Sequence, residues 1–207
     1  MIQISQNSEQ HQLIKNHDYF NIIVLPFLFI SNCISLSILT GTPDIFIKNY
    51  FDFFYYFFLS YISIDLSWLL IQPECVGQPV PIIFHHVICL IGWILSTNNS
   101  DFSLLARICS LVELNTFFNI LKRYYKYDVI YYLFYITWFG FRLGMLPYLC
   151  YLSSLNLLNC LEGSNITTCY DCLFFTSSAY LIQCLNLKWT WDLMTKKGYL
   201  GVSSKKD

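Results

Sequence analysis

Long runs of apolar residues dominate this chain, and short segments carrying the charges and turn residues separate them. A helix needs about 20 apolar residues to cross the hydrocarbon core of a bilayer, with roughly 17 to 25 tolerated. Runs near that length cover residues 19–40, 51–71, 82–96, 104–121, 130–152 and 169–193. The pattern predicts an all-α, multi-pass integral membrane protein in which about six transmembrane helices form one bundle.

Turn residues mark the ends of several of these runs. The first run ends at Gly-Thr-Pro over residues 41–43, and the second stops before Pro73 because proline breaks the helical hydrogen-bond ladder. The third run is the shortest, and its helix is expected to start at Pro81, since proline is tolerated in a first turn. A re-entrant third segment therefore stays open as an alternative to a full span.

Composition supports a membrane setting. Of the 207 residues, 56% are hydrophobic and only 12% are charged, against roughly 25% charged in a soluble domain. The 12 basic and 13 acidic residues give a net charge of -1, which excludes a nucleic-acid partner because such proteins need a basic patch. Membrane lipids are the expected partners.

Basic residues outside the spans predict the orientation. One side collects eight, while the opposite side holds only Lys48. The eight are Lys15, Lys122, Arg123, Lys126, Lys196, Lys197, Lys205 and Lys206. By the positive-inside rule both termini face the cytosol. The chain then divides into a cytosolic segment 1–18, a transmembrane domain 19–193 and a basic cytosolic tail 194–207. A re-entrant third segment would move the amino terminus to the far side.

Loop motifs bear on the compartment. Glycosylation triplets at 98–100 and 165–167 fall in loops that the charge count places outside the cytosol, which agrees with the orientation. The final Lys205-Lys206-Asp207 approximates a dilysine retrieval signal, favouring the endoplasmic reticulum, with the mitochondrial inner membrane as the second choice.

Three cysteines gather around the fifth predicted loop. Cys160 could form a bridge with Cys169 or Cys172 in an oxidising lumen, and unpaired thiols are the alternative. Cys169 and Cys172 also have the spacing of a redox or zinc motif, but no second pair follows them.

Ionisable groups inside the spans are the candidates for chemistry. Each costs roughly 2.5 to 3.5 kcal/mol or more at the bilayer centre, so such groups usually face the bundle interior and bind a partner. The polar set comprises Asp65, His85, His86, Glu113, Asn115, Asn119 and Arg142. Imidazole titrates near neutral pH, so the adjacent histidines could move a proton and position a substrate oxygen.

Two other interpretations of this polar set stay open. The residues could form interhelical hydrogen bonds that only fix packing, with Glu113 and Arg142 neutralising one another. His85 and Cys89 are one turn apart and share a helix face, as metal ligands would, but no further ligand is apparent and no metal is expected.

At these residues the chain resembles the TLC-domain family, the membrane domain shared by translocating-chain-associating proteins and ceramide synthases. The resemblance covers roughly residues 50–200, and the 27-position step from His86 to Glu113 adds to its specificity. Its parts are YFF at 56–58 with Asp65, FHHV at 84–87, VELNTFFN at 112–119, FRL at 141–143 with Pro147, and LNLKW at 185–189.

The resemblance implies a six-helix domain enclosing a lipid-accessible cavity that His85 and His86 face. In ceramide synthases the paired histidines serve transfer of an acyl group from acyl-coenzyme A to a sphingoid base. Carried over, His85 and His86 would act on the acyl group and Asp65 would orient them. Those enzymes bear a His-Asp pair and a further Asp where this chain reads SLVELN over 110–115, so it looks closer to the non-synthase branch.

Two functions are weighed on this basis. The first is a protein that binds acyl chains or sphingolipids and influences membrane lipid composition, with N-acyl transfer as its enzymatic form. In that form acyl-coenzyme A is a substrate, no cofactor is needed, and Glu113, Asn115, Asn119 and Arg142 would contact substrate. The second is a non-catalytic accessory subunit of a larger membrane complex, such as a respiratory or translocation assembly, with membrane-protein partners.

Overall fold

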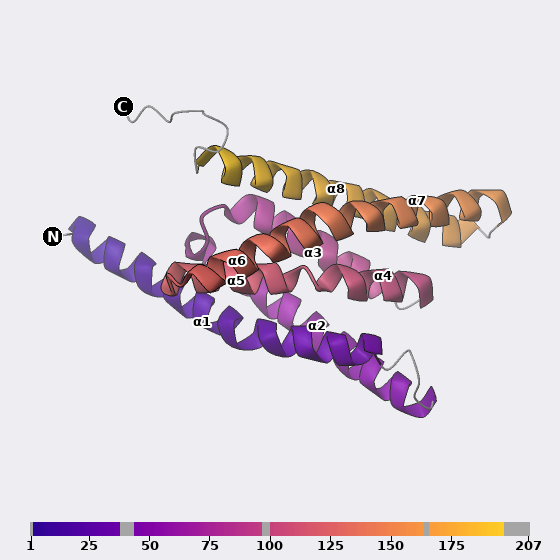
Figure 1. The fold of residues 1–207 in the computed structure, drawn as a ribbon, viewed down its shortest axis with the longest axis horizontal. Helices are drawn as coiled ribbons and strands as arrows, with labels where there is room; N and C mark the ends of the chain where they lie inside the picture. Colours follow the sequence, from indigo (N-terminus) through magenta and orange to yellow (C-terminus); the bar gives the residue numbers. More distant parts are fainter. Residues whose placement is uncertain (1, 38–43, 97–99, 164–165, 197–207) are drawn as a thin grey trace. The chain divides into compact units, whose positions relative to one another are not determined.

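The computed structural model describes residues 2–37, 44–96, 100–163 and 166–196, and every regular element in those ranges is helical (Figure 1). The helices are α1 (Ile2–Ser37), α2 (Asp44–Ile71), α3 (Pro79–Leu95), α4 (Ser100–Ser110), α5 (Glu113–Tyr124), α6 (Asp128–Thr137), α7 (Leu146–Gly163) and α8 (Ile166–Lys196). A short 3-10 helix, η2 (Pro73–Cys75), and a π-helix, η4 (Trp138–Met145), complete the chain order. The all-α fold class is confirmed.

Several helices are longer than the apolar runs that predicted them, because polar residues that flank a run can also be helical. α1 begins well before Tyr19, and α3 starts at Pro79 rather than at Pro81. Both prolines of α3 lie in its first turn, where a missing N–H costs nothing. Residues 98–99 of the first glycosylation triplet, residue 165 of the second, and the basic residues after Lys196 lie outside the described residues.

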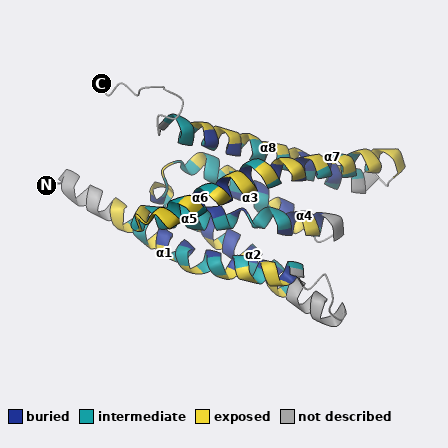
Figure 2. Cartoon of the chain, in the orientation of Figure 1, coloured by how far each residue is buried: buried dark blue, intermediate teal, exposed yellow. Residues whose placement is uncertain are grey.

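Four stretches are long and apolar enough to cross a membrane: Gln10–Leu36, Asp52–Ile71, Phe102–Tyr124 and Asp128–Gly163. α3 is a shorter apolar helix of 17 residues, about 25 Å at 1.5 Å per residue, and α8 is not among the four. The chain is therefore an integral membrane protein by the length and composition of its helices. Large side chains such as Ile23, Phe27 and Leu70 stay exposed, as lipid-facing residues do, and exposed positions recur along the helices in Figure 2.

The chain divides into two compact units, residues 1–138 and 139–207. In the first unit α1 packs against α2 and α5, α2 packs against α3, and α5 packs against α6. An aromatic group joins α2 to α3: the ring centroids of Phe58 and Trp93 are 4.4 Å apart, and Phe54 meets Trp93 edge-on at 5.7 Å. This packing fixes the face of α2 that carries Asp65 against α3.

Two local irregularities place candidate residues. Between α4 and α5 the backbone tightens into i to i+3 bonds, including Asn115 N–H to Val112 O at 2.9 Å, and Glu113 and Asn115 lie at this turn. Arg142 lies in η4, the wider π-helix that immediately precedes α7 and its Pro147. Such departures from α geometry re-aim side chains and often occur at functional positions.

The second unit is a pair of antiparallel helices, α7 and α8. Thr176 donates a hydrogen bond to the Ser153 carbonyl at 3.0 Å, and the Ser154 and Tyr180 hydroxyls lie 3.1 Å apart. Toward the end of α7 the contacts move toward the start of α8, from Ser153–Thr176 to Cys160–Cys172, which is an antiparallel register.

Candidate functional site: a carboxylate between two histidines

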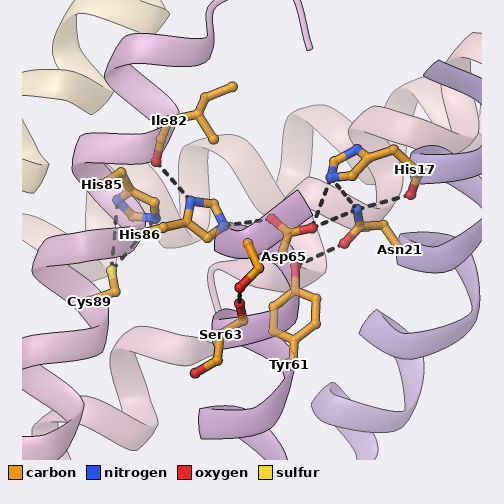
Figure 3. Close-up of polar contacts among 10 residues, drawn as sticks. His17, Asn21, Tyr61, Ser63, Asp65, Ile82, His85, His86 and Cys89 are labelled. Atoms are coloured by element: carbon orange, nitrogen blue, oxygen red, sulfur yellow. Dashed lines mark hydrogen bonds and ion pairs between the residues drawn. The ribbon is translucent and has the colours of Figure 1, made fainter. Parts of the chain in front are cut away.

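Asp65 on α2 is the centre of the most polar buried group in the first unit. Its side chain is 3% exposed, and each carboxylate oxygen meets an imidazole nitrogen (Figure 3). His86 Nε2 from α3 lies 2.8 Å from Oδ2, and His17 Nε2 from α1 lies 2.9 Å from Oδ1. Three helices thus contribute one side chain each to a group of one carboxylate and two imidazoles. We call His17, Asp65 and His86 the Asp65 cluster.

A second layer of hydrogen bonds orients this cluster. The Asn21 amide donates to Asp65 Oδ1 at 3.3 Å and to the His17 carbonyl at 3.1 Å. The Tyr61 hydroxyl donates to Asn21 Oδ1 at 2.9 Å. Asn21 and Tyr61 are both buried, and the Asn21 side-chain oxygen and amide nitrogen both have hydrogen-bond partners within the protein. The carboxylate is thereby held in one orientation.

Proton accounting limits what His86 can do. Its Nδ1 lies 2.8 Å from the Ile82 carbonyl, which only accepts, so Nδ1 carries a hydrogen. Its Nε2 faces a carboxylate oxygen, so a second proton is shared between Nε2 and Asp65 Oδ2. Both ring nitrogens are therefore committed. His86 can hold a proton beside Asp65, and the Asp65 carboxylate fixes the orientation of the His86 ring.

His85 differs from its neighbour. Successive helical residues point about 100° apart, and the two rings are perpendicular at 84° with centroids 5.5 Å apart. His85 is half-buried, and its ring nitrogens lie 3.7 and 3.8 Å from Cys89 Sγ, one turn along α3 (Figure 3). Glu113, half-buried on α5, interacts electrostatically with Cys89 and with His86. Four of the seven predicted site residues therefore share one neighbourhood: His85, His86, Asp65 and Glu113.

The other three predicted residues lie elsewhere. Asn115 is fully buried, and its amide donates to the Phe134 carbonyl at 3.1 Å and the Thr137 hydroxyl at 3.0 Å, which ties α5 to α6. Asn119 is half-buried on α5. Arg142 belongs to the second unit and is described below.

Arg142 has partners within its own unit. Its Nη1 donates to Asn186 Oδ1 at 2.6 Å, and its guanidinium carbon lies 5.6 Å from the Trp189 ring centroid. Asn186 also donates to the Ile182 carbonyl at 3.0 Å, so the acceptor is itself fixed. These contacts bind the guanidinium to α8.

Sequence reasoning missed His17 and Asn21. Both lie in α1, and His17 falls in the segment 1–18 that the apolar pattern leaves outside the first span. Their i, i+4 spacing puts them on one helix face. Two polar residues at this spacing are common, so the pattern is weak evidence for a site. Only the packing of α1 against α2 identifies Asp65 as their partner.

Other buried polar groups of the first unit fix helix packing. Asp18 accepts a hydrogen bond from the Tyr124 hydroxyl at 2.8 Å and pairs with Arg123 at 2.8 Å, joining α1 to α5. Arg107 of α4 donates to the Ser35 hydroxyl at 3.1 Å, and the Asn32 amide donates to the Arg107 carbonyl at 2.8 Å. Interhelical bonding therefore explains much of the intramembrane polarity, and the Asp65 cluster stands apart through its two histidines.

Cys75, in the turn between α2 and α3, is fully buried near this cluster. Burial, followed by the charges of Asp65 and Asp18, raises the pKa of the Cys75 thiol to about 11. Cys75 is therefore a neutral thiol at physiological pH. Among the residues with described side chains, no three His, Cys, Asp or Glu residues are arranged to hold a metal ion.

These features define the class of protein: a multi-pass helical membrane protein whose helices bury a carboxylate between two imidazoles. The chain belongs to the TLC-domain family, whose model matches residues 10–195. The match starts about 40 positions earlier than the predicted 50–200 and so includes α1 with His17 and Asn21. Neither the curated proteins nor the solved structures contain a significant match.

Proposed function

We propose that this TLC-domain protein binds an acyl-bearing membrane lipid beside α3 and acts on its acyl group, in its enzymatic form by N-acyl transfer. The observation that carries the proposal is the division of labour on α3, where His86 is committed to Asp65 and the adjacent His85 is half-buried on another face. A fixed, proton-holding imidazole next to a second imidazole is suited to acyl transfer. Membrane burial excludes competing water.

In the transfer reaction the amine of a long-chain base attacks the thioester carbonyl of acyl-coenzyme A. The C–N bond forms, the C–S bond breaks, the amine loses a proton to His85, and His85 passes that proton to the leaving coenzyme A thiolate. Asp65, itself held by His17, fixes His86, and the positive charge on the His86 ring can stabilise the developing negative charge electrostatically. No oxidant or cofactor is required.

Among the remaining candidates, we propose Glu113 and Asn119 as substrate contacts. Glu113 shares the neighbourhood of His86 and Cys89, and its carboxylate could bind the amine of a long-chain base. The Asn115 amide and the Arg142 guanidinium are engaged in bonds to Phe134, Thr137 and Asn186, which supports a packing role for both.

The test uses purified full-length protein with acyl-coenzyme A and a long-chain base, with amide product measured by mass spectrometry. Wild type is expected to form amide, and His85→Ala and His86→Ala are expected to lose it. His11→Ala is the matched control, because His11 is an exposed histidine of the same chain. If the wild-type protein retains lipid in native mass spectrometry but forms no amide, lipid binding is supported and N-acyl transfer is contradicted. Neither lipid nor amide would overturn the proposal.

An accessory subunit is the second candidate, and one observation favours it: Asn115, Arg142, Asn32 and Arg107 all form bonds that hold helices together. A role in a complex predicts stoichiometric co-purification with other membrane proteins after mild detergent extraction. A monodisperse monomer carrying bound lipid would contradict it. We also propose the endoplasmic reticulum as the location, which imaging of tagged full-length protein tests.

A further inference from the structure

Three cysteines lie together where α7 ends and α8 begins. Cys160 Sγ, near the end of α7, lies 2.6 Å from Cys172 Sγ on α8, which is closer than unbonded sulfur atoms pack. Cys169 Sγ points to the Cys160 carbonyl at 3.2 Å, and Cys169 is one helical turn before Cys172. Cys172 is almost fully buried, at 1% exposed. The two facing thiols are therefore a pair, and the third lies beside them.

The register of the two helices limits the partners of Cys160, and the sulfur positions then select one. The Ser153–Thr176 and Ser154–Tyr180 contacts lie two helical turns further from the loop and set the same antiparallel alignment. Extending that alignment toward the loop brings Cys160 opposite the part of α8 that carries both Cys169 and Cys172. The sequence alone leaves Cys169 and Cys172 as equal candidates, and the side-chain geometry selects Cys172, because its Sγ faces Cys160 Sγ whereas Cys169 Sγ meets the Cys160 carbonyl.

We propose that Cys160 and Cys172 form a disulfide that staples α7 to α8, and that Cys169 remains a thiol. The oxidant is a small-molecule or protein disulfide. The thiolate of one cysteine attacks this disulfide, releasing one thiol and leaving a mixed disulfide, and the second cysteine displaces the other thiol. The two cysteines lose two protons and two electrons, and the oxidant gains them as two thiols. Formation requires an oxidising compartment.

The sequence places this end of the hairpin in such a compartment. The loop between the fifth and sixth predicted spans lies opposite the side that holds eight basic residues, and it contains the glycosylation triplet at 165–167. Cys160 lies eight residues, about 12 Å of helix, beyond Leu152, where the fifth apolar run ends. Cys160 lies near the end of the apolar stretch Asp128–Gly163 and Cys172 near the start of the sixth predicted run, so the thiol pair is at the predicted non-cytosolic end of both.

Differential alkylation of the wild-type protein tests the pairing. Membranes are dissolved in denaturant with N-ethylmaleimide, reduced, and labelled with iodoacetamide before peptide mapping. Cys160 and Cys172 are expected to carry the second label and Cys169 the first. First-label modification of Cys160 and Cys172 would overturn the proposal, as would a Cys160–Cys169 linked peptide before reduction. Because wild type is used, the result does not depend on a variant folding.

Two serine variants give a second readout. Cys172→Ser is expected to lower the melting temperature of the detergent-solubilised protein and to abolish its further fall on addition of dithiothreitol. Cys169→Ser is the matched control and is expected to keep both the wild-type melting temperature and the response to dithiothreitol. Equal behaviour of the two variants would contradict the assignment of Cys172.

Discussion

The two units of this protein bury polar groups in different ways. The first unit assembles its Asp65 cluster from α1, α2 and α3, and all three members are titratable. The second unit is a two-helix hairpin in which Arg142 meets a neutral amide, and hydroxyls and thiols provide the other contacts. A carboxylate and two imidazoles can exchange protons, whereas a guanidinium stays charged and an amide neutral. The Asp65 cluster is therefore suited to proton transfer, whereas the contacts of the second unit are suited to holding its two helices together.

The largest expected effect comes from Asp65→Asn. The substitution removes the charge that both imidazoles face and leaves buried N–H groups with one acceptor fewer. Breaking a buried ionic group by removing one partner costs about 3–5 kcal/mol, so the free energy of unfolding should fall by that order. Thermal unfolding in detergent measures it, with the exposed Asp128→Asn as the matched control. An unchanged melting temperature would mean that the carboxylate does not hold the three helices together.

Arg142→Gln tests the second unit and should have the next largest effect. A hydrogen bond to a charged group contributes about 1.5–3 kcal/mol, and Asn186 loses its donor in the variant. We expect lower thermal stability with amide formation per folded molecule unchanged. A rise in the KM for either substrate at normal stability would instead place Arg142 in the binding machinery and weaken the contrast between the two units.

A double-mutant cycle resolves the parts of the Asp65 cluster. His17→Ala and Asp65→Asn should show a coupling energy of about 0.5–3 kcal/mol, since contacting residues are non-additive. His11→Ala with Asp65→Asn should be additive, because His11 is exposed. Unfolding free energies of the singles and doubles supply the measurement. Additivity of His17 with Asp65 would contradict the three-helix arrangement.

The smallest effect concerns the reactivity of Cys75. Its pKa of about 11 means that the thiolate fraction, and with it the rate of maleimide labelling, should rise only as pH approaches 11. A cysteine peptide with an ordinary thiol pKa of about 8.5 is the control. Because the charge of Asp65 contributes to the raised pKa, Asp65→Asn should move the labelling midpoint to lower pH. An ordinary midpoint in wild type would contradict the burial of the Cys75 thiol, and an equal midpoint in Asp65→Asn would contradict a contribution from the charge of Asp65.

The fold brings some of the predicted site residues together, and those residues are the ones with local sequence signals. Adjacent histidines on a short apolar helix, and carboxylates within two other apolar runs, predicted His85, His86, Asp65 and Glu113. His17 was missed because the apolar run starts after it, although the helix does not. Asn115 gave the same polar-in-membrane signal, but its amide bonds the backbone of α6.

The sequence by itself determined that the chain lies in a membrane, and it determined the helical fold class and the family. Apolar runs of membrane length and the spacing of a few motifs can be read from a single chain. Tertiary structure decided which polar groups meet. It brought His17 to Asp65 across 48 positions and Cys160 to Cys172 rather than Cys169, because partner choice depends on helix register and on which faces pack. A one-dimensional pattern shows that a buried charge needs a partner, and only packing identifies it.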